Sequence, residues 1–318
     1  MAIGDDHSLR VGWLHRHLPH SSGLAIDVAV LDIAQDFLLA HLEGHDIFQD
    51  LVIFKGGTAL RKLFAGAGGR FSTDLDVAVR GMADDRSAVA GLIADLSEVT
   101  LGPFAFDPSN SGGRWRIRVE SDFGNPVQTI KLDVGPPCWL EPDQRTFVGI
   151  ATHNRYGFEL PSIPCMSLEE ILAEKIARLT RTSTARDAYD LHWAATTHPH
   201  SGFDRDLVRR LAVMKVWVDN HGLADIWRPA IGPKPFVPDE WLSPRTGRWD
   251  SEEIGQLTHP PPNLADLETE LCRDYTWLAD LTGQEPMFAR ADAGDRGAMI
   301  EAVRSTRRSA IAPDANLF

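Results

Sequence analysis

The stretch Leu51-Val-Ile-Phe-Lys-Gly-Gly-Thr58 begins with a short apolar run and ends on two adjacent glycines before a threonine. An apolar run of this length, stopped by a glycine pair, is typical of a short buried strand. Thr58 is suited to cap a helix that we expect over residues 59–64. Because glycine has no Cβ, the backbone N–H groups of Gly56 and Gly57 can approach a phosphate closely. The stretch therefore predicts a strand, a candidate phosphate-binding turn and a helix.

A second strand pattern follows a glycine-rich loop, in Arg70-Phe-Ser-Thr-Asp-Leu-Asp-Val-Ala-Val79. Apolar residues at positions 75, 77 and 79 alternate with Asp74, Asp76 and Ala78, so one face packs in the core and the other presents both aspartates. Two carboxylates held this close repel unless a cation lies between them, and Mg²⁺ or Mn²⁺ is a common solution. Asp74 and Asp76 are therefore candidate metal ligands. The alternative is a pair of solvent-facing acids on an edge strand.

Residues 128–134 form another strand pattern, and it carries a third acid. Asp133 shares a face with Lys131, opposite the apolar residues of the same stretch. Asp133 is a candidate third metal ligand if this strand lies beside the one that carries Asp76. An ordinary surface acid is the alternative.

Residues 114–120 form a strand pattern whose arginines alternate onto one face. Such a row can bind the phosphates of an RNA, and the alternative is a solvated sheet face. The candidate phosphate-binding arginines are Arg61, Arg114, Arg116, Arg118 and Arg178.

Lys175 lies near the middle of the apolar stripe of a helix predicted over residues 168–181. A lysine on a buried face needs an anionic partner, either a carboxylate or a phosphate, unless its stem only crosses the apolar surface to reach solvent. A second helix, predicted over residues 185–195, places Asp187 and Asp190 on one face together with packing residues.

The overall composition limits the class of protein. The 318 residues are 43% hydrophobic and 24% charged, which is typical of a globular protein. A formal net charge of −13 disfavours broad nucleic-acid coating but leaves room for a local basic surface. No apolar run approaches the length of a membrane helix, and the three cysteines are widely spaced without a Cys-x-x-Cys pair. We therefore expect no membrane contact and a cytoplasmic location.

The chain divides by pattern into a strand–helix front half and a mainly helical back half. The predicted domains are residues 1–164 and residues 165–318, with a boundary near Pro161-Ser-Ile-Pro164. We expect an α/β (α+β) fold in which a short mixed sheet lies in the first domain.

Five ordered motifs resemble those of the AbiEii/AbiGii nucleotidyltransferase toxins, a family that includes the mycobacterial MenT toxins of type IV toxin–antitoxin systems. The motifs are Phe54-Lys-Gly-Gly-Thr-Ala-Leu60, Arg70-Phe-Ser-Thr-Asp-Leu-Asp76, Ile130-Lys-Leu-Asp133, Glu174-Lys175 and Arg186-Asp-Ala-Tyr-Asp-Leu191. The resemblance covers roughly residues 50–195. It departs from the family in a longer loop before Asp74 and in Gly57, where many relatives have serine.

The resemblance implies a polymerase-β-like nucleotidyltransferase core with a helical C-terminal half that completes the active site. By that resemblance Gly56, Gly57, Thr58 and Lys175 bind nucleotide, while Asp74, Asp76 and Asp133 hold metal. The implied catalytic residues are Asp74, Asp76, Lys175 and one of Asp187 or Asp190, with Asp187 favoured.

The implied activity is transfer of a nucleoside monophosphate from an NTP to RNA, with the 3′ end of tRNA as leading acceptor and translation as the process blocked. The cofactor is Mg²⁺ or Mn²⁺, and a cognate antitoxin encoded nearby is the implied partner. Two alternatives stay open. One is a nucleotidyltransferase that modifies a small molecule or a protein, which the net acidic charge favours. The other is a module that binds nucleotide or antitoxin without turnover.

Overall fold

The computed structural model covers the chain and describes residues 4–19, 25–80, 83–97, 99–112, 114–182, 184–197, 202–221, 234–243, 257 and 264–310. The chain forms two compact units, which we describe separately. Unit 1 comprises Met1–Cys138, Pro142–Met166 and Gln256–His259, and unit 2 comprises Trp139–Glu141, Ser167–Gly255 and Pro260–Phe318. The limits of 1–164 and 165–318 stay a prediction about domains, because compact packing does not establish that either part folds alone.

Unit 1 is built on a mixed sheet, which among the described residues has eight strands in the order β3-β4-β5-β6-β2-β1-β8-β7. The strands are β1 (Val52–Lys55), β2 (Asp74–Val79), β3 (Val99–Leu101), β4 (Phe104–Ser111), β5 (Arg114–Ser121), β6 (Gln128–Gly135), β7 (Asp143–Thr146) and β8 (Ser162–Cys165). The pairs β2–β6 and β1–β8 are parallel, and the remaining pairs are antiparallel. The two acid-bearing strands β2 and β6 are therefore direct neighbours.

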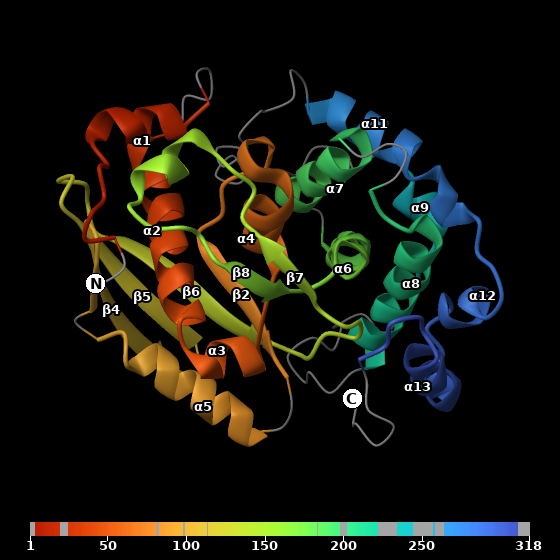
Figure 1. The fold of residues 1–318 in the computed structure, drawn as a ribbon. Coiled ribbons are helices and arrows are strands. Elements are labelled where there is room, and N and C mark those ends of the chain that lie inside the picture. Colours follow the sequence, from red (N-terminus) through yellow and green to blue (C-terminus); the bar gives the residue numbers. More distant parts are fainter. Residues whose placement is uncertain are drawn as a thin grey trace. The chain divides into compact units, whose positions relative to one another are not determined.

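Helices cover one face of this sheet, and α2 and α5 lie across it in Figure 1. The helical segments of unit 1 are α1 (Val11–His17), α2 (Ile26–Glu43), α3 (Asp46–Leu51), α4 (Gly56–Leu60), the π-helical turn η1 (Arg61–Ala65), the short 3₁₀ turns η2 (Gly66–Gly68) and η3 (Ala151–Arg155), and α5 (Ala83–Ala94). Buried side chains of α2, such as Phe37 and Leu38, join the apolar side chains of the strands in one core. On β5 and β6 the alternate residues are exposed, which leaves the opposite face of these strands open.

Four strand predictions are confirmed, at β1, β2, β5 and β6. The sequence did not predict β3, β4, β7 or β8. Strand β4 alternates only over its first four residues and then ends in polar, mostly exposed residues, and β8 contains Pro164, so both local patterns are weak. Their extended conformation depends on pairing with neighbouring strands, which local pattern does not reveal.

The prediction that Thr58 caps a helix beginning at residue 59 is wrong. Helix α4 begins at Gly56, with Lys55 at the N-cap position and no side-chain cap. Gly56 has a left-handed backbone conformation, with φ of 77°, which a residue other than glycine rarely adopts. This conformation turns the chain so that the helix begins at Gly56, before the position where a Thr58 cap would start it. Thr58 is buried inside the helix, and its hydroxyl donates a hydrogen bond to the backbone carbonyl of Asp74. Thr58 thus ties the turn to β2.

Unit 2 is mainly helical. Its helical segments are α6 (Leu168–Arg181), α7 (Ala185–Thr197), α8 (Arg205–His221), α9 (Pro238–Trp241), α11 (Leu264–Asp274), η5 (Thr276–Ala279), α12 (Glu285–Phe288), η6 (Ala293–Asp295) and α13 (Arg296–Arg304). Helix α6 has the predicted bounds, and the Ser167 hydroxyl accepts a hydrogen bond from the Glu170 N–H. Among the described helices of the chain, none is long and apolar enough to cross a membrane.

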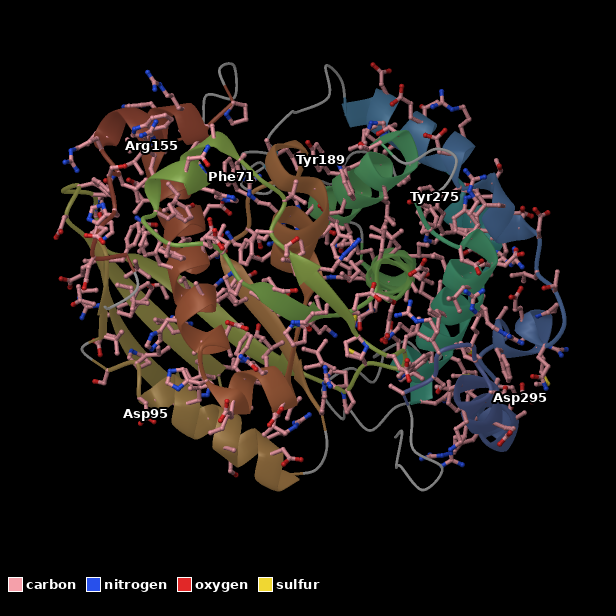
Figure 2. The ribbon with its side chains drawn as sticks, viewed as in Figure 1. Phe71, Asp95, Arg155, Tyr189, Tyr275 and Asp295 are labelled. Carbon is pink, nitrogen blue, oxygen red and sulfur yellow. The ribbon has the colours of Figure 1, made fainter. Side chains whose placement is uncertain are left out.

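Two buried aromatic side chains fix α6 and α7 within unit 2. The Trp241 Nε1–H donates to the carbonyl of Ile176 on α6 at 3.1 Å. The Tyr275 hydroxyl, labelled in Figure 2, donates to the carbonyl of Leu191 on α7 at 2.8 Å. Buried aromatic rings with a satisfied polar atom bury a large apolar area and also set orientation. These contacts hold the two helices that carry Lys175 and Asp190.

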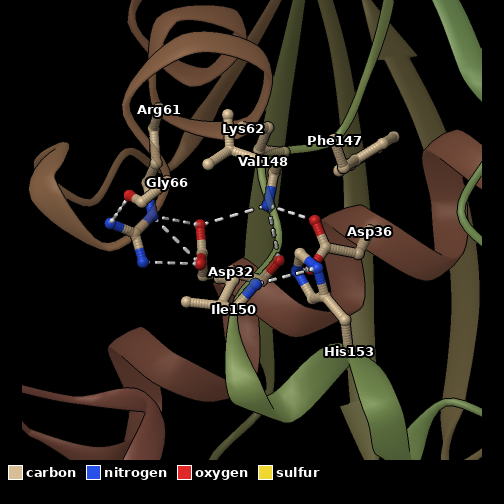
Figure 3. A pocket seen from close by; sticks show the side chains of 9 residues that line it. All are labelled: Asp32, Asp36, Arg61, Lys62, Gly66, Phe147, Val148, Ile150 and His153. Carbon is tan, nitrogen blue, oxygen red and sulfur yellow. Dashed lines mark hydrogen bonds and ion pairs between the residues drawn. The ribbon is translucent and has the colours of Figure 1, made fainter.

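A buried charge network joins α2 to the turn η1 in unit 1 (Figure 3). The Asp32 carboxylate contacts the Arg61 guanidinium at 3.0 Å, the Lys62 amine at 3.1 Å and the His17 ring at 2.7 Å. The Asp36 carboxylate contacts Lys62 at 2.6 Å. Because every member is nearly or fully excluded from solvent, removal of one charge leaves its partners desolvated and uncompensated.

This network predicts a stability loss in acid. Burial opposes ionisation of Asp32, but Arg61, Lys62 and His17 outweigh it and hold the pKa of Asp32 well below its ordinary value. The pKa of Asp36 is lowered in the same way, since Lys62 and His153 outweigh burial. A lowered pKa in the folded state contributes stability that is complete above the unfolded value, about 3.9, and is lost as the pH falls below it.

We therefore expect the free energy of unfolding to fall as the pH drops below about 4. Asp32→Asn should lower the free energy of unfolding at pH 7 by about 3–5 kcal/mol. In this variant the free energy of unfolding should also change less as the pH drops below about 4. Urea unfolding from pH 3 to 7 measures both effects. Asp95→Asn, at an exposed position labelled in Figure 2, is the control and should match wild type. An unchanged stability in Asp32→Asn would contradict this account.

Candidate active site

The two aspartates of β2 lie on the side of the sheet opposite its apolar residues, as predicted. Asp74 and Asp76 are half-buried, while Leu75, Val77 and Val79 are buried. In the parallel register with β6, Asp76 is opposite Asp133 and Asp74 is opposite Lys131. Directly opposed residues in neighbouring strands present their side chains on one face. The acids of β2 and the exposed Asp133 thus occupy the same face of unit 1.

The glycine turn directly contacts this acidic face. A Cβ at Gly56 would overlap the Oδ2 atom of Asp76, and its φ of 77° is a conformation that favours glycine. The carboxylate of Asp76 therefore packs on the backbone of the turn itself. The candidate phosphate-binding turn and the candidate metal ligand, widely separated in sequence, form one surface.

The donor set fits a divalent cation held by two protein carboxylates. Mg²⁺ usually takes one or two carboxylates and completes its shell with water and substrate phosphate, and Asp74 with Asp76 provides that set. Within the described residues, however, no three His, Cys, Asp or Glu side chains are grouped closely enough to hold a metal ion. The assignment of Asp133 as a third metal ligand therefore stays a prediction. The Oδ1 atom of Asp74 instead accepts a hydrogen bond from Thr73 and lies 4.0 Å from the Lys131 amine.

Two buried cations adjoin the turn, and neither was predicted. Lys55 is 8% exposed and is the register partner of Asp76 in the antiparallel β1–β2 pair. Its amine lies 3.5 Å from the position that a Cβ at Gly135 would occupy. Arg70 is 5% exposed and contacts the turn at Gly57. The available signal was the presence of Lys55 and Arg70 within the first two quoted motifs, although motif position alone does not show that a charge is buried.

Arg61 does not face a phosphate path, and that prediction is corrected. Its side chain is 2% exposed and donates to Asp32, to the Gly66 carbonyl at 3.3 Å and to the Gly69 carbonyl. The physical reason is that η1 packs against α2, whose buried carboxylates attract Arg61 and Lys62 inward.

The strand arginines do share an exposed face. Arg114, Arg116 and Arg118 are exposed on β5, and Arg116 is the register partner of Lys131 on β6. The charge of Arg118 is partly neutralised by ion pairs with Glu120 at 3.1 Å and with Asp107 at 3.8 Å. The register therefore connects Arg116, Lys131 and Asp74 across three neighbouring strands.

In unit 2, Lys175 contacts two carboxylates. Its Nζ atom lies 3.1 Å from Asp187 Oδ1 and 2.7 Å from Asp190 Oδ2. The side chain of Lys175 is 7% exposed, so the alternative of a lysine that reaches solvent is excluded in this structure. Thr184 donates to Asp187 Oδ2 at 2.7 Å, and Arg178 lies 3.4 Å from the same oxygen. Both aspartates contact Lys175, so proximity alone does not choose between them.

A mixed sheet that presents two neighbouring carboxylates beside a glycine turn is the arrangement we expect of an enzyme that transfers nucleotides. The chain belongs to the nucleotidyl transferase AbiEii toxin family of type IV toxin–antitoxin systems, whose family model matches residues 38–275. This confirms the predicted family.

A solved relative supports the same assignment. The nucleotidyltransferase toxin MenT4 of Mycobacterium tuberculosis H37Rv is 31% identical, with 94% of this chain and 100% of that chain covered and a TM-score of 0.80. The predicted fold class, a mixed α/β arrangement with a nucleotidyltransferase core, is thereby confirmed. JHP933 from Helicobacter pylori is similar at a lower level, with 16% identity over 89% of this chain and 100% of that chain and a TM-score of 0.45. No curated protein matches the sequence.

Proposed function

We propose that this toxin-family nucleotidyltransferase transfers a nucleoside monophosphate from an NTP to RNA, with the 3′ end of tRNA as acceptor. In this proposal the modified tRNA no longer supports translation, a cognate antitoxin restrains the protein, and the reaction takes place in the cytoplasm. The observation that carries it is the packing of the Asp76 carboxylate on the Gly56 turn. That contact brings the candidate phosphate-binding turn and a candidate metal-binding carboxylate together within unit 1.

The chemistry is a substitution at the α-phosphorus of the NTP. The terminal hydroxyl oxygen of the acceptor forms a bond to that phosphorus, and the bond to the oxygen bridging to the β-phosphorus breaks. Pyrophosphate leaves, and the hydroxyl proton passes to a carboxylate base. The backbone N–H groups of Gly56 and Gly57 would bind phosphate oxygens. Asp74 and Asp76 would hold Mg²⁺ or Mn²⁺, which supplies charge neutralisation at the phosphates.

The cluster of Lys175, Asp187 and Asp190 is assigned to transfer by the family resemblance. Its geometry supports a positioning role for the cations Lys175 and Arg178, because both contact Asp187, to which the Thr184 hydroxyl also donates. Donors on both carboxylate oxygens hold Asp187 in one orientation. For that reason we favour Asp187 over Asp190 as the acid that acts in the reaction.

The exposed cations of β5 and β6 support an RNA acceptor. We expect Arg116→Glu to raise the KM for tRNA about tenfold and to leave the KM for NTP unchanged. The logarithm of the KM for tRNA should also depend less steeply on the logarithm of the salt concentration, by about the contribution of one phosphate contact. Steady-state kinetics at several salt concentrations measure both. Arg210→Glu, at an exposed position of α8, introduces the same change in net charge and is the matched control. Equal effects of the two variants would show that only overall charge matters.

A transfer assay tests the function directly. The protein is incubated with each of the four labelled NTPs and either a total tRNA pool or a protein extract. Label in tRNA with release of pyrophosphate is the expected result. Label in protein or in a small molecule would contradict an RNA acceptor and would support the alternative of a protein or small-molecule acceptor. Tight NTP binding without pyrophosphate release under any condition would favour the non-catalytic module.

A further inference from the structure

Arg70 is a buried cation placed directly on the phosphate-binding turn. It is 5% exposed, although arginine is rarely buried without a reason. A Cβ at Gly57 would overlap the Nη2 atom of Arg70 and would lie 3.1 Å from its Cζ. The guanidinium therefore occupies the space that a side chain at Gly57 would take.

The two glycines of the turn are required for different reasons. Gly56 has a φ of 77°, and its missing side chain also leaves room for the Asp76 carboxylate. Gly57 does not have a positive φ, so its backbone conformation suits any residue. Only the guanidinium of Arg70 excludes a side chain there. Consecutive residues of the turn thus contact a carboxylate and a guanidinium.

The loop that precedes Arg70 is held firmly by a second buried arginine. Arg61 donates to the carbonyls of Gly66 and Gly69 and lies 3.8 Å from the centre of the Phe71 ring. Asp32 fixes Arg61 in turn, within the network of Figure 3. Arg70 itself donates from Nη1 to the carbonyl of Phe71 at 3.1 Å. The guanidinium of Arg70 is therefore preorganised before any ligand binds.

We propose that Arg70 binds the triphosphate of the nucleotide at the Gly56-Gly57 turn, an inference that rests on the proposed nucleotidyl transfer. A guanidinium presents a planar fork of N–H donors that matches phosphate oxygens, and charge-assisted bonds of this kind are strong. A polyanion placed beside Asp74 and Asp76 requires positive charge nearby. As pyrophosphate leaves it gains charge, and a fixed cation beside it stabilises the transition state. Arg61 is then a positioning residue for Arg70.

The test measures nucleotide binding by calorimetry without any acceptor. The probes are the four NTPs and one nucleoside. The nucleoside is the one that corresponds to the NTP bound most tightly by the wild-type protein, and it lacks the triphosphate. We expect Arg70→Gln to weaken NTP binding about ten- to a hundredfold, with nucleoside binding unchanged. Arg10→Gln is the matched control, because the exposed Arg10 also donates to a neighbouring carbonyl, that of Leu9 at 2.7 Å.

Gly57→Ala provides a second, independent variant. The added methyl group leaves the guanidinium in the chain but displaces it from the turn, so NTP binding should weaken as in Arg70→Gln. In the double variant Gly57→Ala/Arg70→Gln the methyl meets no guanidinium, so it should weaken NTP binding less than it does in the presence of Arg70. Such non-additivity is expected of residues in direct contact.

The outcomes separate this inference from the proposed function. If Arg70→Gln binds NTP within twofold of the wild-type affinity, the role of Arg70 is overturned, while the proposed nucleotidyl transfer is not affected. Equal losses of NTP and nucleoside binding, with a lowered melting temperature, assign Arg70 to the fold and also overturn it. A wild-type protein that binds no NTP overturns nucleotidyl transfer, and this inference with it.

Discussion

Asp76→Asn is expected to abolish nucleotidyl transfer while unit 1 stays folded. Asparagine has nearly the same shape, so its contact with Gly56 is kept, but it lacks the charge that binds a divalent cation. We expect the rate of transfer to fall by at least about a hundredfold. The initial rate of label transfer and the melting temperature together distinguish chemistry from folding.

The matched control for this variant is Asp107→Asn. Asp107 lies on β4, its side chain is 62% exposed, and its nearest cation is Arg118. Loss of that surface charge should leave transfer and melting temperature close to wild type. If Asp76→Asn kept more than half of the wild-type rate, Asp76 would not be a catalytic residue.

Lys175→Met is expected to lose both transfer and stability. The sequence alone left open whether the anionic partner of Lys175 is a carboxylate or a phosphate. The structure places it between Asp187 and Asp190, so removal of the ammonium leaves two buried carboxylates without the cation that both contact. Breaking a buried ion pair in this way costs about 3–5 kcal/mol. Urea unfolding and the transfer assay measure the two losses.

A neutral version of the same cluster separates stability from activity. In Lys175→Met/Asp187→Asn/Asp190→Asn no buried charge is left uncompensated among these three residues, so most of the lost stability should return. Transfer should stay absent if the charges act in the reaction. Wild-type stability in Lys175→Met would contradict the ion-pair account, and wild-type transfer in that variant would remove Lys175 from the active site.

Features with a local periodicity were determined by the sequence itself. The alternation of residues 74–79 sufficed to place Asp74 and Asp76 on one face of a strand, because side chains on a strand alternate whatever lies beside it. The bounds of α6 were predicted from the sequence, whose apolar stripe the structure confirms. The burial of Lys175 followed from the same stripe. The ordered motifs identified the family, which the family model and MenT4 confirm.

The partners of buried charges were decided only by the tertiary structure. Arg61 and Arg70 both lie between the glycine turn and Asp74, yet one pairs with Asp32 of α2 and the other packs on Gly57. Lys175 contacts two carboxylates because α7 packs beside α6. Periodicity follows from the backbone of a single element, but a charge withdrawn from water takes its partner from whichever element packs against it. That choice depends on contacts between distant parts of the chain.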